Sequence, residues 1–201
     1  EIPFASLPET LGEHIIENRH SVVVAGTHGK TTTTSLGAWV CEEAGLEPGF
    51  LVGGLAKNFS RSFQNPKGNY FVIEGDEYDT AFFAKVPKFT FYKPQSVILT
   101  SIEFDHADIY RDLDHVLQAF SSLMPLVPKE EGVLVYNGED ANIQKILSSC
   151  GAPKVSYGFK EADWTVGSWE LGREGLNFEI LYKGRSEDSL FLPMFGQYNI
   201  L

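Results

Sequence analysis

A strand, a glycine-rich loop and a helix follow one another between residues 21 and 45, and few folds accommodate that order. The apolar run over 22–25 predicts a buried strand over 21–25, and residues 26–32 read Gly-Thr-His-Gly-Lys-Thr-Thr. A helix is predicted from there to Gly45, which is a typical C-terminal cap. This arrangement directs several backbone N–H groups and the positive end of a helix towards one point, which suits a polyphosphate.

The polar residues of this loop match the chemistry of a bound nucleotide. Gly26 and Gly29 allow the required backbone geometry, and Lys30 would reach the terminal phosphates as a point charge. The hydroxyl of Thr31 would bind Mg²⁺, and Thr32 would donate to a phosphate oxygen. The sequence therefore predicts that ATP and Mg²⁺ bind at this loop.

The loop departs from the general phosphate-loop pattern at one position. That pattern requires a glycine where this chain has Val24, so the shorter form G-x-x-G-K-T-T stands here. The alternative is an ordinary strand-to-helix turn with a chance Lys-Thr pair. The agreement of strand, glycines, lysine and hydroxyl favours nucleotide binding.

The charge balance limits which partners the chain could serve. It has 16 Lys and Arg against 27 Asp and Glu, a net charge of −11, which argues against binding to nucleic acid or to an anionic membrane. The apolar runs are far shorter than a membrane span and no signal-peptide pattern opens the chain, so we expect a cytoplasmic protein. Cys41 and Cys150 are widely separated and are interpreted as small buried apolar side chains.

Strands and helices continue to alternate after the loop, which is typical of an α/β fold with a doubly wound, mostly parallel sheet flanked by helices. Short apolar runs predict strands, and apolar residues spaced three to four apart predict helices. The predicted strands are 70–74, 96–100, 133–136 and 154–157, and the further predicted helices are 7–18, 113–126 and 141–149.

The apolar periodicity also predicts which helix faces are buried. These positions are Leu7, Leu11, Ile15 and Ile16 in the first helix and Leu36, Val40 and Ala44 in the helix after the loop. Asp112 is expected to cap the helix over 113–126.

The pattern changes from about Trp164. Apolar and polar residues alternate over 176–182, and glycine-containing turns flank that run, which predicts an antiparallel meander. We interpret residues 158–195 as a small antiparallel β-element appended near the C-terminus, and not as a second domain.

Acidic residues follow two of the predicted strands, at the sheet edge where α/β folds bind ligands. Glu74 is the last residue of the strand over 70–74, and we expect it to meet the metal held by Thr31. Asp76 and Glu77, which follow it, are interpreted as solvated loop residues.

His106 lies in the second acidic run, which extends from Glu103 to Asp108 after the strand over 96–100. A neutral imidazole binds Mg²⁺ weakly, or holds a metal-bound water or a phosphate. A histidine in a loop is also common without a function, so its spacing leaves both interpretations open.

These segments together resemble the central domain of the Mur ligases, the ATP-dependent amide-forming enzymes of peptidoglycan synthesis. Residues 25–33 are similar to the phosphate loop of that family, and Glu74 and His106 stand where the family has metal-binding residues. The stretches 74–83 and 103–110 resemble the members that recycle cell-wall tripeptide more than those that add L-alanine. The resemblance spans essentially all 201 residues.

The resemblance implies an ATP-driven condensation. The carboxylate of UDP-N-acetylmuramate takes the γ-phosphoryl group of ATP, and the amino group of the tripeptide L-Ala-γ-D-Glu-meso-diaminopimelate attacks the resulting acyl phosphate, so that an amide and phosphate form.

The resemblance also assigns site residues. It implies catalytic roles for Lys30, Glu74 and His106. It also implies that Thr31 and Glu74 hold one Mg²⁺ and that His106 helps to hold a second. The nucleotide site comprises Gly26, Thr27, His28, Gly29, Lys30, Thr31 and Thr32, with Asn137 and Asp140 at the adenine and ribose edge. Gly53, Gly54 and Asn58 would face the UDP-sugar.

Two features differ from the family pattern. Many Mur ligases carry a carbamylated lysine shortly after the metal-binding histidine, but this sequence has no lysine between Lys93 and Lys129, so we expect no carbamate bridge. Residues 196–201 resemble the family's Gly-x-His-Asn hinge with Tyr198 in place of histidine, and we assign Tyr198 no catalytic role.

We expect residues 1–201 to be the ATP-binding central domain, without the family's N-terminal UDP-binding domain and C-terminal amino-substrate domain, and therefore inactive as a ligase alone. Three alternatives stay open. The chain could belong to an L-alanine-adding ligase or a folylpolyglutamate-type relative, or serve as a nucleotide-binding module without ligase chemistry. A generic phosphate-loop phosphatase would need a residue that positions water, and nothing in the sequence requires one.

Overall fold

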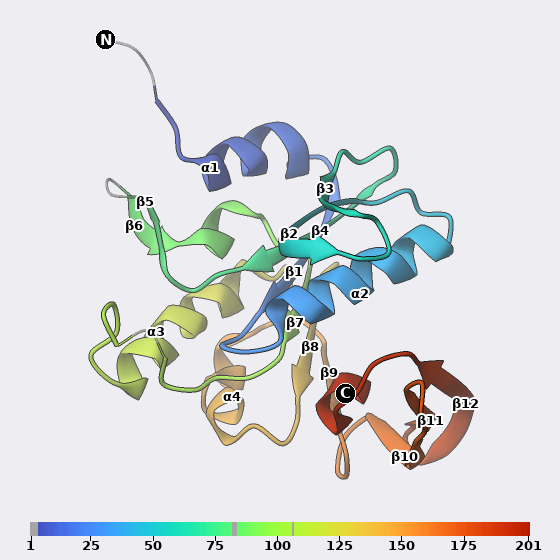
Figure 1. Cartoon of the computed structure of the whole chain (residues 1–201). Coiled ribbons are helices and arrows are strands. Elements are labelled where there is room, and N and C mark those ends of the chain that lie inside the picture. Colours follow the sequence, from blue (N-terminus) through green and yellow to red (C-terminus); the bar gives the residue numbers. More distant parts are fainter. Residues whose placement is uncertain (1–3, 82–83, 106) are drawn as a thin grey trace.

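The computed structural model describes residues 4–81, 84–105 and 107–201. Over these residues the chain forms a ten-stranded sheet in the order β12-β11-β10-β9-β8-β7-β1-β4-β2-β3 (Figure 1). Its strands are β1 (His20–Ala25), β2 (Gly49–Ala56), β3 (Arg61–Gln64), β4 (Tyr70–Gly75), β7 (Ser96–Leu99), β8 (Val133–Asn137), β9 (Lys154–Gly158), β10 (Trp164–Leu171), β11 (Leu176–Tyr182) and β12 (Arg185–Leu192). A separate hairpin pairs β5 (Asp79–Ala81) with β6 (Ala84–Pro87).

The centre of the main sheet is parallel, as predicted. β1 lies between β4 and β7 and pairs in parallel with both, and β8 and β9 continue the parallel order beyond β7. Val23, Val24 and Ala25 of β1 are fully buried because both faces of the sheet are covered. The carboxyl ends of these strands consequently lie along one edge of the sheet.

Helices cover both faces of this sheet. The helices are α1 (Leu7–Leu11), which continues as a π-helical turn over Gly12–Ile16, α2 (Lys30–Glu43), α3 (Leu113–Leu123) and α4 (Ala141–Ile146). Short 3₁₀ turns lie at Lys88–Phe91, Met124–Leu126, Leu147–Ser149 and Gln197–Ile200. Among the described residues, no helix is both long and apolar enough to cross a membrane.

The alternation of side chains along β4 divides the core into two parts. Val72 points to the face that α2 covers, where it packs with Ala38 and Phe50. Its neighbours Phe71 and Ile73 belong to the larger core on the other face, which α3 and α4 close. Two helix ends match the prediction: Asp112 caps α3 by accepting the N–H of His115 at 2.9 Å, and Gly45 has φ +72° just after α2.

The predicted buried face of α2 was wrong. Leu36 and Val40 are 41% and 57% exposed and Ala44 is also exposed, whereas Thr34 and Ala38 are fully buried. The phosphate loop fixes where α2 begins and therefore which side meets the sheet, and small side chains allow the helix to approach β4 closely.

The predicted face of the first helix was wrong at one position. Leu7 is 66% exposed because it is the first residue after the helix cap, Ser6, and lies beyond the core that Ile16 reaches. Leu11 and Ile15 pack against that core, as predicted. Cys150 is buried as predicted, and Cys41 is half-buried; both thiols are free.

The C-terminal β-element is antiparallel, with β11 paired to both β10 and β12. It is also joined to the main sheet, because β10 begins with a short parallel pairing to β9. Val166, Leu176 and Ile200 form a small core of its own. Residues 164–192 therefore extend the same sheet. They are the orange and red strands labelled β10, β11 and β12 in Figure 1.

Candidate functional site

The phosphate loop connects β1 to α2 with two glycines in conformations that other residues rarely adopt. Gly26 has φ +134° and Gly29, which precedes the first residue of α2, has φ +84°. A Cβ atom on Gly26 would lie 2.1 Å from Thr100 Oγ1 and 2.9 Å from the backbone nitrogen of Ser101. The loop therefore packs tightly against the segment that follows β7.

We predict that Gly26→Ala displaces this loop and weakens Mg-ATP binding at least tenfold, because the added methyl group collides with backbone as well as with a side chain. Gly45→Ala is the matched control. Gly45 also has a positive φ but nothing lies within 4 Å of its added Cβ, so this variant should lose only about 1 kcal/mol of stability. Titration calorimetry and thermal unfolding of both variants check the prediction, and equal nucleotide affinities would contradict it.

Lys30 begins α2, and its ammonium group is held by the protein. Lys30 Nζ donates to the carbonyl oxygen of Gly26 at 2.7 Å and lies 3.3 Å from Glu77 Oε2 and 3.9 Å from Asp76 Oδ1. Asp76 also pairs with Lys88 at 2.8 Å. Positive and negative charges thus alternate along this cluster, and its acids hold the Lys30 ammonium group next to the Gly26 oxygen of the phosphate loop.

Asp76 and Glu77 are not the solvated loop acids that the sequence suggested. Only 2% of the Glu77 side chain is exposed, because the chain turns inward after β4 and brings both acids beneath the phosphate loop. Burial of carboxylates requires paired cations, and Lys30 and Lys88 provide them. The Tyr110 hydroxyl donates to the backbone oxygen of Glu77, and burial, with the Glu77 charge as a second cause, raises the pKa of Tyr110 above its ordinary value.

We predict that Glu77→Gln lowers the free energy of unfolding by about 2 kcal/mol, because it leaves the largely buried Lys30 charge with less compensation. The double variant Lys30→Met/Glu77→Gln removes both charges and should be more stable than Glu77→Gln alone. Urea unfolding of the single and double variants measures this coupling. Strictly additive losses would show that the two side chains do not depend on one another.

Thr31 and Glu74 lie next to one another, as two residues predicted to hold the same Mg²⁺ must, while their binding of the metal stays a prediction. Thr31 Oγ1 donates to Glu74 Oε2 at 3.0 Å, and the backbone N–H of Gly53 donates to Glu74 Oε1 at 2.6 Å. A hydroxyl and a carboxylate are oxygen donors of the kind that Mg²⁺ prefers when phosphates and water complete its coordination. Among the described residues there is no group of three or more His, Cys, Asp and Glu that could hold a metal without such help.

The other loop residues divide into two groups. Thr32 is exposed in the first turn of α2 and His28 is exposed in the loop, where His28 Nε2 lies 3.6 Å from Glu103 Oε2. Thr27 is buried, and its backbone N–H donates to the Ser101 oxygen at 2.8 Å. The polar groups of Thr27 therefore face the segment after β7.

Asn137 and Asp140 lie at the same sheet edge, at the end of β8 and the start of α4. Asn137 Oδ1 accepts the N–H of Glu139 at 3.0 Å. Asp140 Oδ1 caps α4, accepting the N–H groups of Asn142 and Ile143 at 2.8 and 3.0 Å. Their contacts with adenine and ribose stay predictions, as does the role of His106, which lies outside the described residues.

Sequence reasoning missed Thr100 and Ser101. Thr100 Oγ1 lies 2.6 Å from the oxygen of His28, and Ser101 Oγ accepts the N–H of His28 at 3.2 Å. These hydroxyls fix the outer part of the phosphate loop. Their position directly after a buried strand beside the loop strand was a signal that could have identified them.

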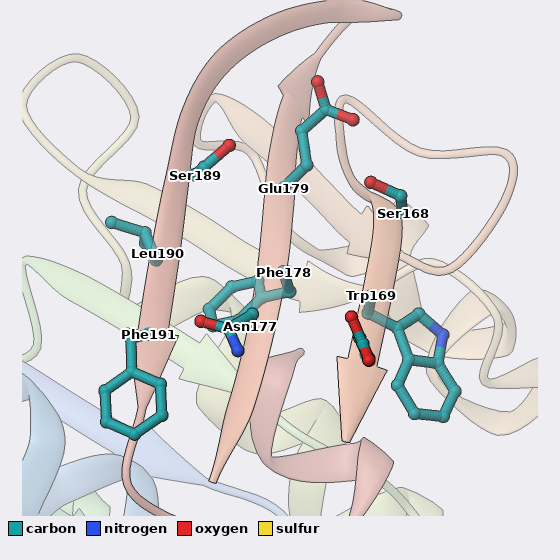
Figure 2. Close-up of a pocket in the computed structure, with 9 residues that line it drawn as sticks. Ser168, Trp169, Asn177, Phe178, Glu179, Ser189, Leu190 and Phe191 are labelled. Atoms are coloured by element: carbon teal, nitrogen blue, oxygen red, sulfur yellow. The ribbon is translucent and has the colours of Figure 1, made fainter. Parts of the chain in front are cut away.

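An open hollow of about 440 Å³ lies away from this edge, across β10, β11 and β12 (Figure 2). Figure 2 shows its lining residues spread along three neighbouring strands, with Trp169 and Phe191 towards opposite sides. The described residues that line it include Glu170 and Glu179 and no basic side chain. An anionic nucleotide would be repelled there, so the chemistry points to the phosphate loop and not to this hollow.

We compared the chain with protein families, with curated proteins and with solved structures. The family model described as the Mur ligase middle domain matches residues 24–201. The UDP-N-acetylmuramate–L-alanyl-γ-D-glutamyl-meso-2,6-diaminoheptandioate ligase of Escherichia coli is 35% identical over 200 residues, which cover 99% of this chain and 43% of that protein. A UDP-N-acetylmuramate–L-alanine ligase of Clostridium kluyveri is 34% identical over 201 residues, which cover 100% of this chain and 42% of that protein.

A solved structure gives the same result. The crystal structure of the UDP-N-acetylmuramate:L-alanyl-γ-D-glutamyl-meso-diaminopimelate ligase of Neisseria meningitidis has a TM-score of 0.89 and 40% identity, over 98% of this chain and 63% of that chain. Judged by the Escherichia coli relative, of which it covers 43%, the chain spans less than half the length of this curated relative.

Proposed function

This chain belongs to the Mur ligase family, and we propose that it is the ATP-binding central domain of a ligase that joins a peptide to UDP-N-acetylmuramate. The observation that carries the proposal is the convergence of three features at one sheet edge. These are the positive-φ glycine loop, the ammonium group of Lys30 and the Thr31–Glu74 pair.

ATP would bind with its phosphates against the backbone N–H groups at the start of α2 and beside Lys30. The positive end of α2 and the Lys30 charge attract the phosphates despite the net charge of −11, because both act at short range in a partly buried site. Thr31 and Glu74 would hold Mg²⁺, which neutralises charge on the phosphate oxygens. We also propose that His106 helps to hold a second Mg²⁺.

The reaction would begin when the muramate carboxylate attacks the γ-phosphorus of ATP. The bond to the ADP oxygen breaks, and an acyl phosphate forms. The peptide amine then attacks the carbonyl carbon, loses a proton and expels phosphate. In this scheme Lys30 stabilises the negative charge on the transferred oxygens, and the loop amides keep them in position.

The tripeptide L-Ala-γ-D-Glu-meso-diaminopimelate is the proposed amino substrate, and the proposed location is the cytoplasm. Support comes from the diaminopimelate-containing substrates in the names of the Escherichia coli and Neisseria relatives, at 35% and 40% identity. L-alanine is the second candidate, because the Clostridium kluyveri L-alanine ligase is 34% identical. The share of each relative that this chain covers suggests that other domains bind the UDP-sugar and the amine, so the chain alone should not ligate.

Phosphate release by the full-length protein tests the proposal. Mg-ATP and UDP-N-acetylmuramate are supplied with tripeptide in one arm and L-alanine in the other, and the amide product is followed by mass spectrometry. Release that depends on the tripeptide supports the proposal. Release with L-alanine alone would replace it with the second candidate, and ATP binding without any amide product would indicate a nucleotide-binding module.

A further inference from the structure

We propose that Thr27, Asp140 and Asn142 are positioning residues that clamp the segment Ile102–Glu103 between the phosphate loop and α4. The inference rests on the proposed function, because it concerns the geometry of the same nucleotide site. It assigns to Thr27 and Asp140 a role other than direct contact with ATP, and it adds Asn142, which no sequence pattern singled out.

The first half of the clamp comes from the phosphate loop. Thr27 Oγ1 accepts the backbone N–H of Glu103 at 2.9 Å and lies 3.3 Å from the backbone oxygen of the same residue. Only 7% of Thr27 is exposed, so water competes poorly for these groups. One threonine hydroxyl thus serves both backbone groups of Glu103.

The second half comes from the start of α4. The backbone N–H of Ile102 donates to Asp140 Oδ2 at 2.9 Å, and Asn142 Nδ2 donates to the backbone oxygen of Ile102 at 2.8 Å. The other oxygen of Asp140 caps α4 and so fixes the orientation of the carboxylate. Because Ile102 is fully buried, its backbone groups need such partners.

The clamp therefore holds the N–H and C=O groups of two consecutive residues with three side chains. Thr27 belongs to the phosphate loop, whereas Asp140 and Asn142 lie at the start of α4. The start of α4 is also where Asp140 was predicted to contact the ribose and adenine. Glu103 is thereby placed relative to the phosphate loop that carries Lys30. A shift of about 1 Å in such a segment can cost on the order of a hundredfold in rate, because reacting groups lose their alignment.

Amide hydrogen exchange on the 201-residue chain tests whether the clamp exists. Thr27→Val and Asn142→Asp keep the side-chain shape but remove the hydroxyl or the amide donor. We expect Thr27→Val to raise the exchange rate of the Glu103 amide at least about tenfold, as for the loss of one hydrogen bond. Asn142→Asp should raise that of the Ile102 amide indirectly, because a carboxylate repels the Ile102 oxygen and moves the Ile102 N–H away from Asp140. Thr27→Ser should retain protection of Glu103, and Asn177→Asp, an exposed change on β11, should alter neither amide.

Kinetics of the full-length protein test whether the clamp positions the site. Thr27→Val and Asn142→Asp should each lower kcat about tenfold while the KM for ATP changes less than about threefold, because alignment is lost and not binding. The double variant Thr27→Val/Asn142→Asp should lose far less than the product of the single losses, because the first change already releases the segment. Asn177→Asp should leave kcat unchanged.

Each other outcome overturns a defined part of the proposal. Unchanged exchange of Glu103 in Thr27→Val would show that the clamp is absent. Faster exchange with an unchanged kcat would remove the positioning role, and multiplicative losses in the double variant would show that the two halves act independently. If the unaltered full-length protein released no phosphate, the proposed function would fail, while the exchange result would still decide whether the clamp exists.

Discussion

Replacing Lys30 with methionine should reduce substrate-dependent phosphate release by the full-length protein at least about a thousandfold, the loss expected when a charge-stabilising group is removed from a phosphoryl-transfer site. Lys30 Nζ already donates to the Gly26 oxygen within the phosphate loop, and methionine removes the charge while it keeps most of the side-chain length. Steady-state phosphate release at saturating ATP and substrates is the measurement.

Two controls separate catalysis from folding in this experiment. Lys129→Met makes the same chemical change at an exposed position and should leave activity unchanged. Lys30→Met/Glu77→Gln avoids an uncompensated Glu77 carboxylate and should be folded yet equally inactive. A folded Lys30→Met variant that kept even a tenth of the activity would contradict the role assigned to this lysine.

Replacing Glu74 with glutamine should have the second largest effect. We expect kcat to fall about a hundredfold and the Mg²⁺ concentration for half-maximal activity to rise at least about tenfold, because a neutral amide is a weaker Mg²⁺ ligand than a carboxylate. Glutamine keeps an oxygen for the N–H of Gly53, so the change removes charge with little change of shape.

A Mg²⁺ titration of activity checks this prediction. Glu43→Gln, at an exposed position near the end of α2, is the matched control and should not alter the Mg²⁺ dependence. A Glu74→Gln variant with reduced kcat and an unchanged Mg²⁺ dependence would show that the carboxylate acts on the structure of the loop and does not hold the metal.

Much of the fold was predictable because it depends on local patterns. The run of apolar residues in β1, the glycines after it and the amphipathic α3 each identify their own structure. β2 was missed because Gly53 and Gly54 interrupt its apolar run, and glycine in a strand interior normally argues against a strand. The buried face of α2 was missed because hydrophobic periodicity assigns large apolar residues such as Val40 to the core. In the structure Val40 is exposed, and the small residues Thr34 and Ala38 are buried.

The candidate site was predictable where it depends on neighbours in sequence or on the general rule that α/β folds bind ligands at the carboxyl ends of their parallel strands. The loop from Gly26 to Thr32 followed from its local pattern, and its proximity to Glu74 followed from the position of Glu74 near the carboxyl end of β4. The burial of Glu77 and the bond between Thr27 and Glu103 did not, because the latter joins residues 76 positions apart. Such contacts depend on how two loops pack against each other in the folded chain, and the periodicity of the sequence does not predict that packing.

We propose that this phosphate loop drives amide formation through transfer of phosphate to a carboxylate. The direct measurement uses UDP-N-acetylmuramate labelled with ¹⁸O in its carboxylate, with ATP, tripeptide and the full-length protein, and mass analysis of the phosphate released. Our account predicts phosphate that carries one ¹⁸O atom from the carboxylate. Unlabelled phosphate would mean that water attacks ATP, and that the loop serves a nucleotide hydrolase and not a ligase.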